Sequence, residues 1–529
     1  MKQQKDNIFI ITKWIFDSLL VLSILEVAFF PDAPNVYGCS TFIIGWILLY
    51  SLVLRIKGTE RNKCLFPYLA LFFLGVSFFW LPLVVTFIEG KPLTFNFENP
   101  YLTFSNQLLN LIMMIAAYRL CLRIYHPHNI IQRFWERIGY FTPPTELQIW
   151  ILGFIGFASF VFFLTIQGTE EADAGNLGFS GHLLQVTRNF ITFPFLLLFK
   201  DLLGINKVSS KHSILLFIYF LFVVALGVAT GKRTPIIGPV VTIVLCYLLP
   251  VFTRNKRVFS KKNSLLCLIF LYLVTGPVAD FAAAMMLGRD DSSRTSASKT
   301  LDNIIKIYQD KELLHRLYQI ALAYSDNGGN NDSGWSEYYV DNILLDRFCN
   351  LRVCDATLYY AQKLGYDNPV MHEYTKKQVL YLIPTPVLNA FGIMDDKFSE
   401  QYSPGDLLSS EGLNYNRRYH GYRVAGDTGI GLYLWGYGYY LWAFFIYAAF
   451  FYLLSTKVLI LKNGRVILSL MSACELYTIL WLLNNSSGII RILHLLLRDI
   501  WQEIIVFCVL YYIIRIISFS HNRTNIELL

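Results

Sequence analysis

The sequence predicts an all-α, polytopic membrane protein of about 12 transmembrane helices, with a large and mostly helical external region between the ninth and tenth spans. Three observations predict this fold class: the composition, a series of long apolar segments, and the distribution of positive charge between them. Of the 529 residues, 55% are hydrophobic and 16% are charged, whereas a soluble domain has about 25% charged residues. The net charge of +8 is spread over short connections between apolar segments, which indicates membrane topology and argues against a nucleic-acid-binding surface.

A transmembrane helix needs about 20 mostly apolar residues, because backbone amides cannot stay unpaired in hydrocarbon. The first apolar segment has no small-residue cleavage site after a short core, so we expect a transmembrane helix there and not a signal peptide. Residues 1–288 then hold nine helices, 289–428 form the external region, and 429–529 hold three helices and a cytoplasmic tail. The expected spans are 8–30, 41–56, 64–88, 104–122, 148–167, 183–204, 213–230, 235–253, 264–286, 429–455, 465–484 and 500–518.

Positive charge alternates between the connections and predicts their orientation. The odd-numbered connections are neutral or acidic, such as 31–40 and 168–182. Because loops rich in Lys and Arg stay in the cytoplasm, we expect both termini to be cytoplasmic and the external region to lie on the other side of the membrane. The even-numbered, basic connections are 55–63, 119–137, 200–211, 254–262 and 457–465.

The external region, residues 289–428, is long enough to fold as a small domain and is unusually rich in aromatic residues. An aromatic ring offers a flat apolar face to a sugar, and the tyrosine hydroxyl adds a polar edge. Trp335 and Tyr422 are our candidate glycan-binding rings, although rings of this kind also build the core of a domain. Cys349 and Cys354 lie in the same region, where a disulfide would persist, and the sequence leaves open whether they pair or remain free thiols.

A cationic hairpin follows the seventh predicted span on the external side, with the sequence Gly-Lys-Arg-Thr-Pro at 231–235. Lys232 and Arg233 run against the general rule that positive charge stays inside, and the hairpin is too short to carry them away from the bilayer surface. Arg holds phosphate oxygens in a bidentate fork, so a lipid-linked pyrophosphate is the predicted ligand. The alternative is ordinary contact with lipid headgroups.

Two further basic patches lie near the external surface. Arg491, His494 and Arg498 are three and four residues apart, which places them on one face of a helix expected at the interface. Arg188, at the external end of the sixth span, is expected to complete this pyrophosphate-binding set. The third patch precedes the tenth span and contains Arg417, Arg418, His420 and Arg423; Arg423 is a candidate glycan ligand, and simple solvation of the patch is the alternative.

Acidic residues give fewer candidates. Asp280 near the external end of the ninth span, Glu26 in the first span and Glu475 in the eleventh are carboxylates within apolar segments, where charge is costly and often functional. No zinc-ligand spacing, Gly-x-Ser-x-Gly or Asp-x-Asp sequence occurs. The sequence therefore predicts no metal and no cofactor.

These features resemble the O-antigen, or oligosaccharide repeat-unit, polymerases of the Wzy type. The resemblance rests on the number of spans, the hairpin at 231–235, the large late external loop, and the glycine- and aromatic-rich segment at 426–438. It differs from the spaced Arg-and-Gly repeat of some members, because Gly238 follows Arg233 too soon. The resemblance implies a bacterial inner-membrane glycosyltransferase of the type C fold that acts on undecaprenyl-pyrophosphate-linked glycans at the periplasmic face.

In such a polymerase, a growing glycan moves from its carrier onto a hydroxyl of the next lipid-linked repeat unit. Arg233, Arg491 and Arg188 would stabilise the negative charge that develops on the pyrophosphate. His420 or Asp280 would take the proton of the acceptor hydroxyl. A chain-length regulator is a possible protein partner. The alternatives are an O-antigen ligase, which uses the same donor, and a polysaccharide flippase or other transporter, which would need charged residues along a path through the membrane.

Overall fold

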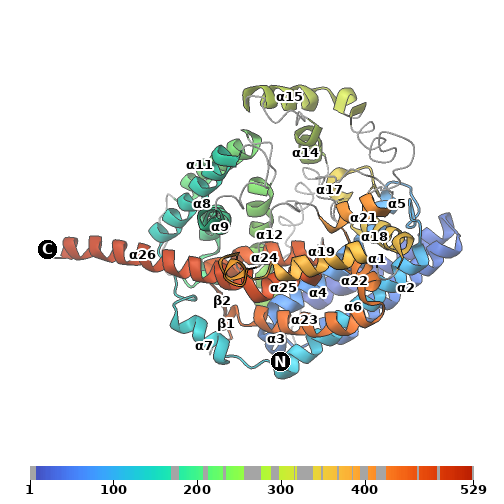
Figure 1. Ribbon diagram of the computed structural model, residues 1–529, viewed down its shortest axis with the longest axis horizontal. Coiled ribbons are helices and arrows are strands. Elements are labelled where there is room, and N and C mark those ends of the chain that lie inside the picture. The colour runs from blue at the N-terminus through green and yellow to red at the C-terminus, as the bar shows by residue number, and fades with distance from the viewer. Residues whose placement is uncertain are drawn as a thin grey trace.

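The structure is a computed structural model that describes residues 7–167, 178–205, 212–229, 234–254, 276–287, 297–314, 316–317, 338–346, 349–365, 368–383, 385–392, 403–412, 425–461, 464–484 and 489–526. These residues form helices almost throughout, and one two-stranded antiparallel sheet accompanies them (Figure 1). The prediction of an all-α protein is confirmed.

Within the described ranges, seven helical segments are long and apolar enough to cross a membrane: Ile8–Phe29, Ala33–Leu54, Leu65–Ile88, Pro100–Ile124, Pro235–Thr253, Gly438–Ser455 and Ile489–Ile517. Three shorter apolar helices, Glu146–Phe162, His212–Gly227 and Leu470–Ile479, fall at three further predicted spans. This content agrees with a multi-pass membrane protein. Most of the ninth predicted span, 264–286, lies outside the described residues.

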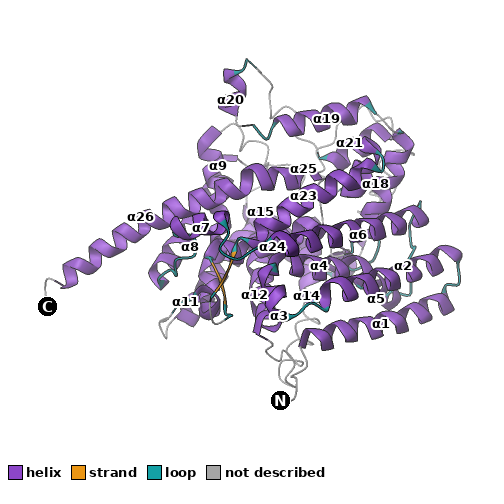
Figure 2. Ribbon diagram, turned by 90° about the horizontal axis from the view of Figure 1, so that it is seen from below, coloured by secondary structure: helices purple, strands orange, loops and turns teal. Residues whose placement is uncertain are grey.

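A first group of helices packs around the N-terminal spans and lies side by side in two views (Figures 1 and 2). Phe42 meets Phe79 and Phe104 edge to face, each at 5.6 Å between ring centroids, and so joins three of these helices. The group consists of α1 (Asn7–Phe29), α2 (Ala33–Leu49), the π-helical turn η1 (Tyr50–Leu54), α4 (Leu65–Phe79), α5 (Leu81–Ile88), α6 (Pro100–Ile124) and α23 (Gly438–Ser455).

A second group surrounds an unusual segment in place of the sixth predicted span. Residues 183–204 do not form one α-helix: α9 (Gly178–Thr187) is followed by η3 (Arg188–Phe199), a 12-residue 3-10 helix, and by α10 (Lys200–Leu203). Pro194 inside η3 has no N–H to donate and disfavours a regular α-helix. The Tyr219 hydroxyl donates to the carbonyl oxygens of Gly153 and Ile191 at 3.1 and 3.0 Å. It thereby ties α11 (His212–Ala229) to α8 (Glu146–Gln167) and η3.

Replacing Gly156 with alanine is expected to destabilise the protein by about 1–3 kcal/mol through overpacking. The new Cβ would lie 2.2 Å from the backbone N of Ile191, so η3 would have to separate from α8. Gly438→Ala, at the first residue of α23, is the control, because it adds the same methyl group and its Cβ meets no atom within 4 Å. Thermal unfolding in detergent compares the two variants, and equal stability would contradict the close backbone packing.

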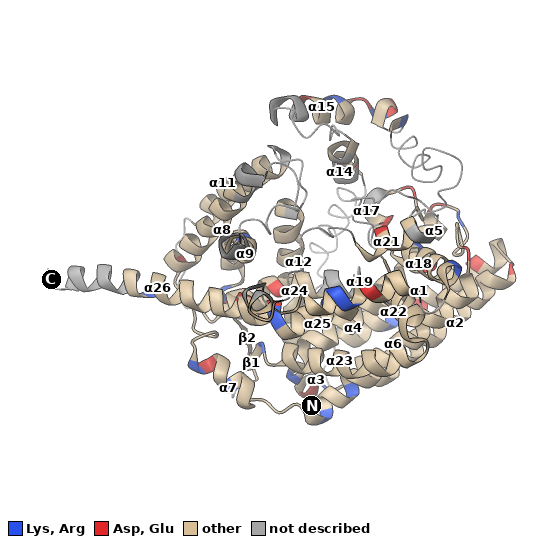
Figure 3. Cartoon of the chain, viewed as in Figure 1, with Lys and Arg blue, Asp and Glu red and all other residues tan. Residues whose placement is uncertain are grey.

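One end of the molecule carries a small β-hairpin and many basic residues. β1 (Val458–Ile460) pairs with β2 (Val466–Leu468), and α24 (Leu470–Asn484) follows. Trp135 in α7 (Ile130–Arg137) donates its indole N–H to the Thr456 hydroxyl at 3.0 Å. α3 (Gly58–Lys63) lies beside the hairpin, and Figure 3 marks Lys and Arg around α3 and α7. The predicted cytoplasmic connections at 55–63, 119–137 and 457–465 therefore meet at one end, which we call the hairpin end.

The opposite end holds the described part of the external region. Asp355 in α18 (Leu351–Leu364) is fully buried and accepts hydrogen bonds from the backbone N–H groups of Glu98 and Asn99, at 2.7 and 2.9 Å, just before α6. The Thr103 hydroxyl donates to it at 2.9 Å, and the buried Arg352 guanidinium lies at 2.7 Å. We call this group the Asp355 joint. It attaches the external region to the start of α6, where a carboxylate also meets the positive end of the helix dipole.

A second contact between the external region and the bundle centres on Lys91. Its ammonium lies 2.9 Å from a Glu89 carboxylate oxygen, 3.1 Å from Asp341 and 2.9 Å from the Tyr338 hydroxyl. Burial alone would lower the pKa of Lys91, but these partners together raise the pKa above its ordinary value. The lysine therefore stays charged and joins the loop after α5 to the segment before α17 (Ile343–Asp346).

The remaining described helices of and beside the external region are short. They are α14 (Pro277–Leu287), α15 (Ala297–Gln309), α19 (Pro369–Leu380), α20 (Thr385–Ala390), α21 (Pro404–Gly412) and α22 (Asp427–Trp435).

The two cysteines of the external region lie in its described part. Cys349 is fully buried, Cys354 is half-buried, and no disulfide joins them; burial raises the pKa of Cys349 well above its ordinary value. The disulfide left open by the sequence is not formed.

Two predicted boundaries are wrong. The tenth span, 429–455, is divided at Gly436, whose φ of 54° and ψ of −149° are open to glycine and strained for other residues. The interfacial helix at 489–499 and the span at 500–518 are one continuous helix, made of α25 (Ile489–His494), the π-helical turn η4 (Leu495–Asp499) and α26 (Ile500–Ile526). The apolar residues between Arg491, His494 and Arg498 extend the candidate span to Ile489–Ile517.

Candidate functional site

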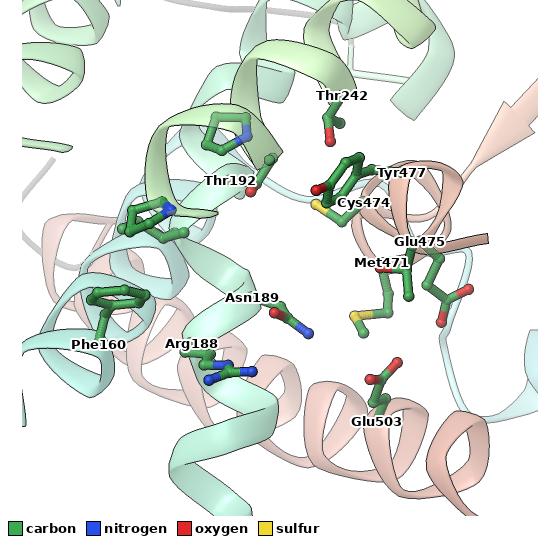
Figure 4. A pocket seen from close by; sticks show the side chains of 15 residues that line it. Phe160, Arg188, Asn189, Thr192, Thr242, Met471, Cys474, Glu475, Tyr477 and Glu503 are labelled. Atoms are coloured by element: carbon green, nitrogen blue, oxygen red, sulfur yellow. The ribbon is translucent and has the colours of Figure 1, made fainter. Parts of the chain in front are cut away.

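A cavity of about 120 Å³ opens between the second group of helices and α24 (Figure 4). This volume is comparable to a few water molecules or one small anionic group. Its walls come from five helices that are far apart in the sequence. The lining residues are Phe160, Arg188, Asn189, Ile191, Thr192, Pro235, Gly238, Pro239, Thr242, Met471, Cys474, Glu475, Tyr477, Thr478 and Glu503.

Arg188 and Asn189 form one wall at the start of η3 (Figure 4). The residue before them, Thr187, is buried and donates its hydroxyl to the Leu183 carbonyl at 2.8 Å, and it also lies 2.8 Å from the Ser159 hydroxyl of α8. These contacts fix the point at which α9 becomes a 3-10 helix. Arg188 is half-buried, so its guanidinium brings a permanent positive charge to the cavity.

The beginning of α12 (Thr234–Arg254) forms a second wall through Pro235, Gly238, Pro239 and Thr242. Proline suits the first turn of a helix, because the N–H that it lacks would have no helical partner there. The positive end of the helix dipole therefore lies at this wall. Lys232 and Arg233, which immediately precede the helix, lie outside the described residues.

Carboxylates form the third wall. Glu475 of α24 is 6% exposed, and one of its oxygens, Oε2, pairs with the ammonium of Lys457, which is fully buried. The other oxygen, Oε1, is buried and has no hydrogen-bond partner among the described residues. Glu503 of α26 is half-buried and also lines the cavity. Positive charge on η3 thus faces a pair of carboxylates on α24 and α26.

No protein-family model matches this chain, and neither the curated proteins nor the solved structures contain a match.

The cavity brings together only part of the predicted pyrophosphate-binding set. Arg188 lines it, whereas Arg491, His494 and Arg498 do not. Arg491 pairs with Asp499 at 2.8 Å. His494 and Arg498 lie 3.0 and 3.2 Å from the carbonyl oxygens of Gln378 and Tyr381 at the C-terminal end of α19. Cations at this position satisfy unpaired helical carbonyls and the negative end of the dipole.

Of the predicted proton acceptors and glycan ligands, the structure describes Asp280, which does not line the cavity. Asp280 lies in the first turn of α14, 3.6 Å from the Lys311 ammonium. His420, Arg423, Tyr422 and Trp335 lie outside the described residues. Glu26, another predicted intramembrane carboxylate, accepts the Leu93 backbone N–H at 2.6 Å and anchors the loop before α6. Within the described ranges, no group of three or more His, Cys, Asp and Glu is arranged to hold a metal.

Sequence reasoning did not single out Asn189, Lys457 or Glu503. Glu503 could have been predicted as a site residue, because it is a carboxylate inside the apolar segment 500–518. Lys457 looked like an ordinary basic residue of a cytoplasmic connection. Its burial follows from the hairpin fold, which turns the chain back against α24 and places the ammonium beside Glu475.

Proposed function

We propose that the protein is a polysaccharide repeat-unit polymerase of the bacterial inner membrane, with both termini in the cytoplasm. It moves a growing glycan from undecaprenyl pyrophosphate onto a hydroxyl of the next lipid-linked repeat unit at the periplasmic face. A chain-length regulator is its proposed protein partner. The observation that carries the proposal is the cavity in which Arg188 meets the start of α12, directly after Lys232 and Arg233.

The chemistry of glycan transfer suits this combination of charges. When the bond between the sugar and the pyrophosphate breaks, negative charge develops on the leaving pyrophosphate. A fixed guanidinium and the N-terminal end of a helix stabilise that charge at no cost of reorganisation. Carboxylates on the opposite wall supply groups that can accept the proton of the acceptor hydroxyl. Arg188 is therefore the described residue with the strongest claim to hold the leaving group.

Arg188→Ala is expected to reduce polymer formation by on the order of 10²-fold or more, by analogy with the loss of one oxyanion donor. The variant is expressed in a strain from which the gene has been deleted. Its surface polysaccharide is then separated by gel electrophoresis according to the number of repeat units. We expect chains of one repeat unit. Arg188→Lys keeps the charge but loses the fork, so partial recovery is expected.

The matched control is Arg119→Ala. Arg119 is exposed and lies 3.4 Å from the Leu52 carbonyl, away from the cavity lining. It should leave chain length unchanged. Protein level and thermal stability are measured for all three variants, because Arg188 makes further contacts. Polymer of normal length in a stable Arg188→Ala protein would refute the proposed role of the cavity.

A transporter of lipid-linked glycan is the second candidate, and the buried Lys457–Glu475 pair favours it, because ionised residues inside a membrane often line a transport path. Deletion of the gene separates the possibilities. A polymerase deletion leaves single repeat units on the final acceptor, and a ligase deletion leaves finished polymer on its carrier. A transporter deletion leaves lipid-linked repeat units on the cytoplasmic side.

A further inference from the structure

The buried carboxylate of Glu475 has one oxygen in use and one oxygen without a partner. Oε2 pairs with Lys457, and Oε1 is buried, has no hydrogen-bond partner within the described residues, and belongs to a side chain that lines the cavity (Figure 4). Leaving a buried carboxylate oxygen without a hydrogen-bond donor is unfavourable. A hydrogen-bond donor could reach this side chain through the cavity that it lines.

The charges of Glu475, Glu503 and Lys457 do not sum to zero when all three groups are ionised. Glu475 and Glu503 interact electrostatically, and Lys457 acts on both. Asp499 and Arg491 also act on Glu503, but they pair with each other at 2.8 Å and cancel. Arg188 lies on the other wall of the cavity (Figure 4) and is not among the charges that act most strongly on Glu475 or Glu503. Two carboxylates and one ammonium leave one negative charge, which a low-dielectric interior does not tolerate.

The other titratable groups that interact with the pair within the described residues are neutral. They are Cys474 on α24 and Tyr140, whose hydroxyl lies 3.0 Å from the Ser472 hydroxyl. None of them carries a positive charge that would complete the balance. One proton completes it, and a proton needs only the free carboxylate oxygen that the structure provides.

We propose that Glu475 and Glu503 together hold one exchangeable proton, with Lys457 as the counter-charge of the carboxylate that stays ionised. Resting on the proposed function, this pair first releases its proton to water through the cavity and then accepts the proton of the acceptor hydroxyl. The hydroxyl oxygen bonds to the anomeric carbon of the donor sugar, and the bond from that carbon to the pyrophosphate oxygen breaks with its electron pair. The hydroxyl proton passes to the carboxylate pair and restores its resting state.

Infrared spectroscopy of the full-length protein in lipid vesicles tests the proton directly, through the carbonyl stretching band of a protonated carboxylic acid. Charge counting makes a sharp prediction at neutral pH. Glu503→Gln leaves one carboxylate and one ammonium, so the band of this pair disappears and both groups are ionised. Glu475→Gln should have the same effect. Lys457→Met removes the counter-charge, so the intensity should rise by one further carboxylic acid.

Glu26→Gln is the matched control, because Glu26 is also buried with one unpartnered oxygen, and glutamine keeps the oxygen that accepts the Leu93 N–H. It can remove only its own contribution and must leave the Glu475–Glu503 band in place. An unchanged spectrum in a folded Glu503→Gln protein would overturn the proposal. So would a band that sodium ions abolish in the wild type, since an alkali cation would then be the occupant.

Failure of this inference can be told apart from failure of the proposed function. In the chain-length assay, Glu503→Gln is expected to lower polymer formation by about 10²-fold or more, and Glu503→Asp should restore part of it. If wild type makes polymer and Glu503→Gln makes it equally fast, the pair is not the proton acceptor and the polymerase remains. If the band behaves as predicted but gene deletion does not shorten the polysaccharide, the proton site stands and the polymerase falls.

Discussion

Lys457→Met is expected to destabilise the protein by about 3–5 kcal/mol at neutral pH, the typical cost of removing one partner from a buried ion pair. Lys457 is fully buried, and its ammonium pairs with Glu475, which is 6% exposed. Without the ammonium, the Glu475 carboxylate loses its counter-charge in a low-dielectric environment beside Glu503 and takes up a proton. Protonation costs free energy at neutral pH, because the same carboxylate is ionised in the unfolded chain. Unfolding of the purified protein in detergent measures the loss.

The double variant Lys457→Met/Glu475→Gln is the control for this prediction. It removes both charges at once, so most of the lost stability should return, as it does when buried pairs are replaced by neutral groups. If the double variant is as unstable as Lys457→Met alone, the loss comes from packing of the lysine side chain and the electrostatic explanation is wrong.

Asp355→Ala is the second substitution with a large expected effect, again about 3–5 kcal/mol. It leaves the buried Arg352 guanidinium without its carboxylate and the backbone N–H groups of Glu98 and Asn99 without their acceptor. The cost falls on the Asp355 joint, so the external region should loosen before the bundle unfolds. Limited proteolysis of the protein in detergent should cut residues 289–428 faster than in the wild type.

Asp341→Asn is the matched control in the same region. Asp341 also faces a cation of the opposing loop, at 3.1 Å from Lys91, but its side chain is 56% exposed. Exposed ion pairs contribute about 0–1 kcal/mol, so proteolysis should change little. Equal sensitivity of the two variants would mean that burial of the Asp355 joint does not matter.

The spans were predictable where long apolar runs stand alone. Leu65–Ile88 and Pro100–Ile124 match the expected 64–88 and 104–122 within a few residues, because hydrocarbon requires this length and composition whatever the neighbours are. The 3-10 helix at Arg188–Phe199 was not predictable in this way. Its form depends on the approach of α8 at Gly153 and Gly156, which composition does not reveal.

In the candidate site, too, single residues could be predicted from the sequence, but the pairs that they form could not. Arg188 was singled out because it lies at the external end of a predicted span, on the same side as the other predicted cationic patches. Lys457 and Glu475 are 18 residues apart, and they meet because the hairpin folds back against α24. The Asp355 joint connects residues 252 to 257 positions apart. Partners of this kind are fixed by tertiary packing, so the sequence shows each residue without showing its neighbour.

The winding of η3 has a mechanical consequence. A 3-10 helix rises about 2.0 Å per residue and an α-helix about 1.5 Å, so the 12 residues of η3 reach about 6 Å further than an α-helix of equal length. Conversion of this segment to an α-helix would shorten it by that length and draw the Arg188 guanidinium out of the cavity. Because Gly156 has no side chain, the extended 3-10 form can pack closely against α8. The Tyr219 hydroxyl holds it there by donating a hydrogen bond to the Ile191 carbonyl.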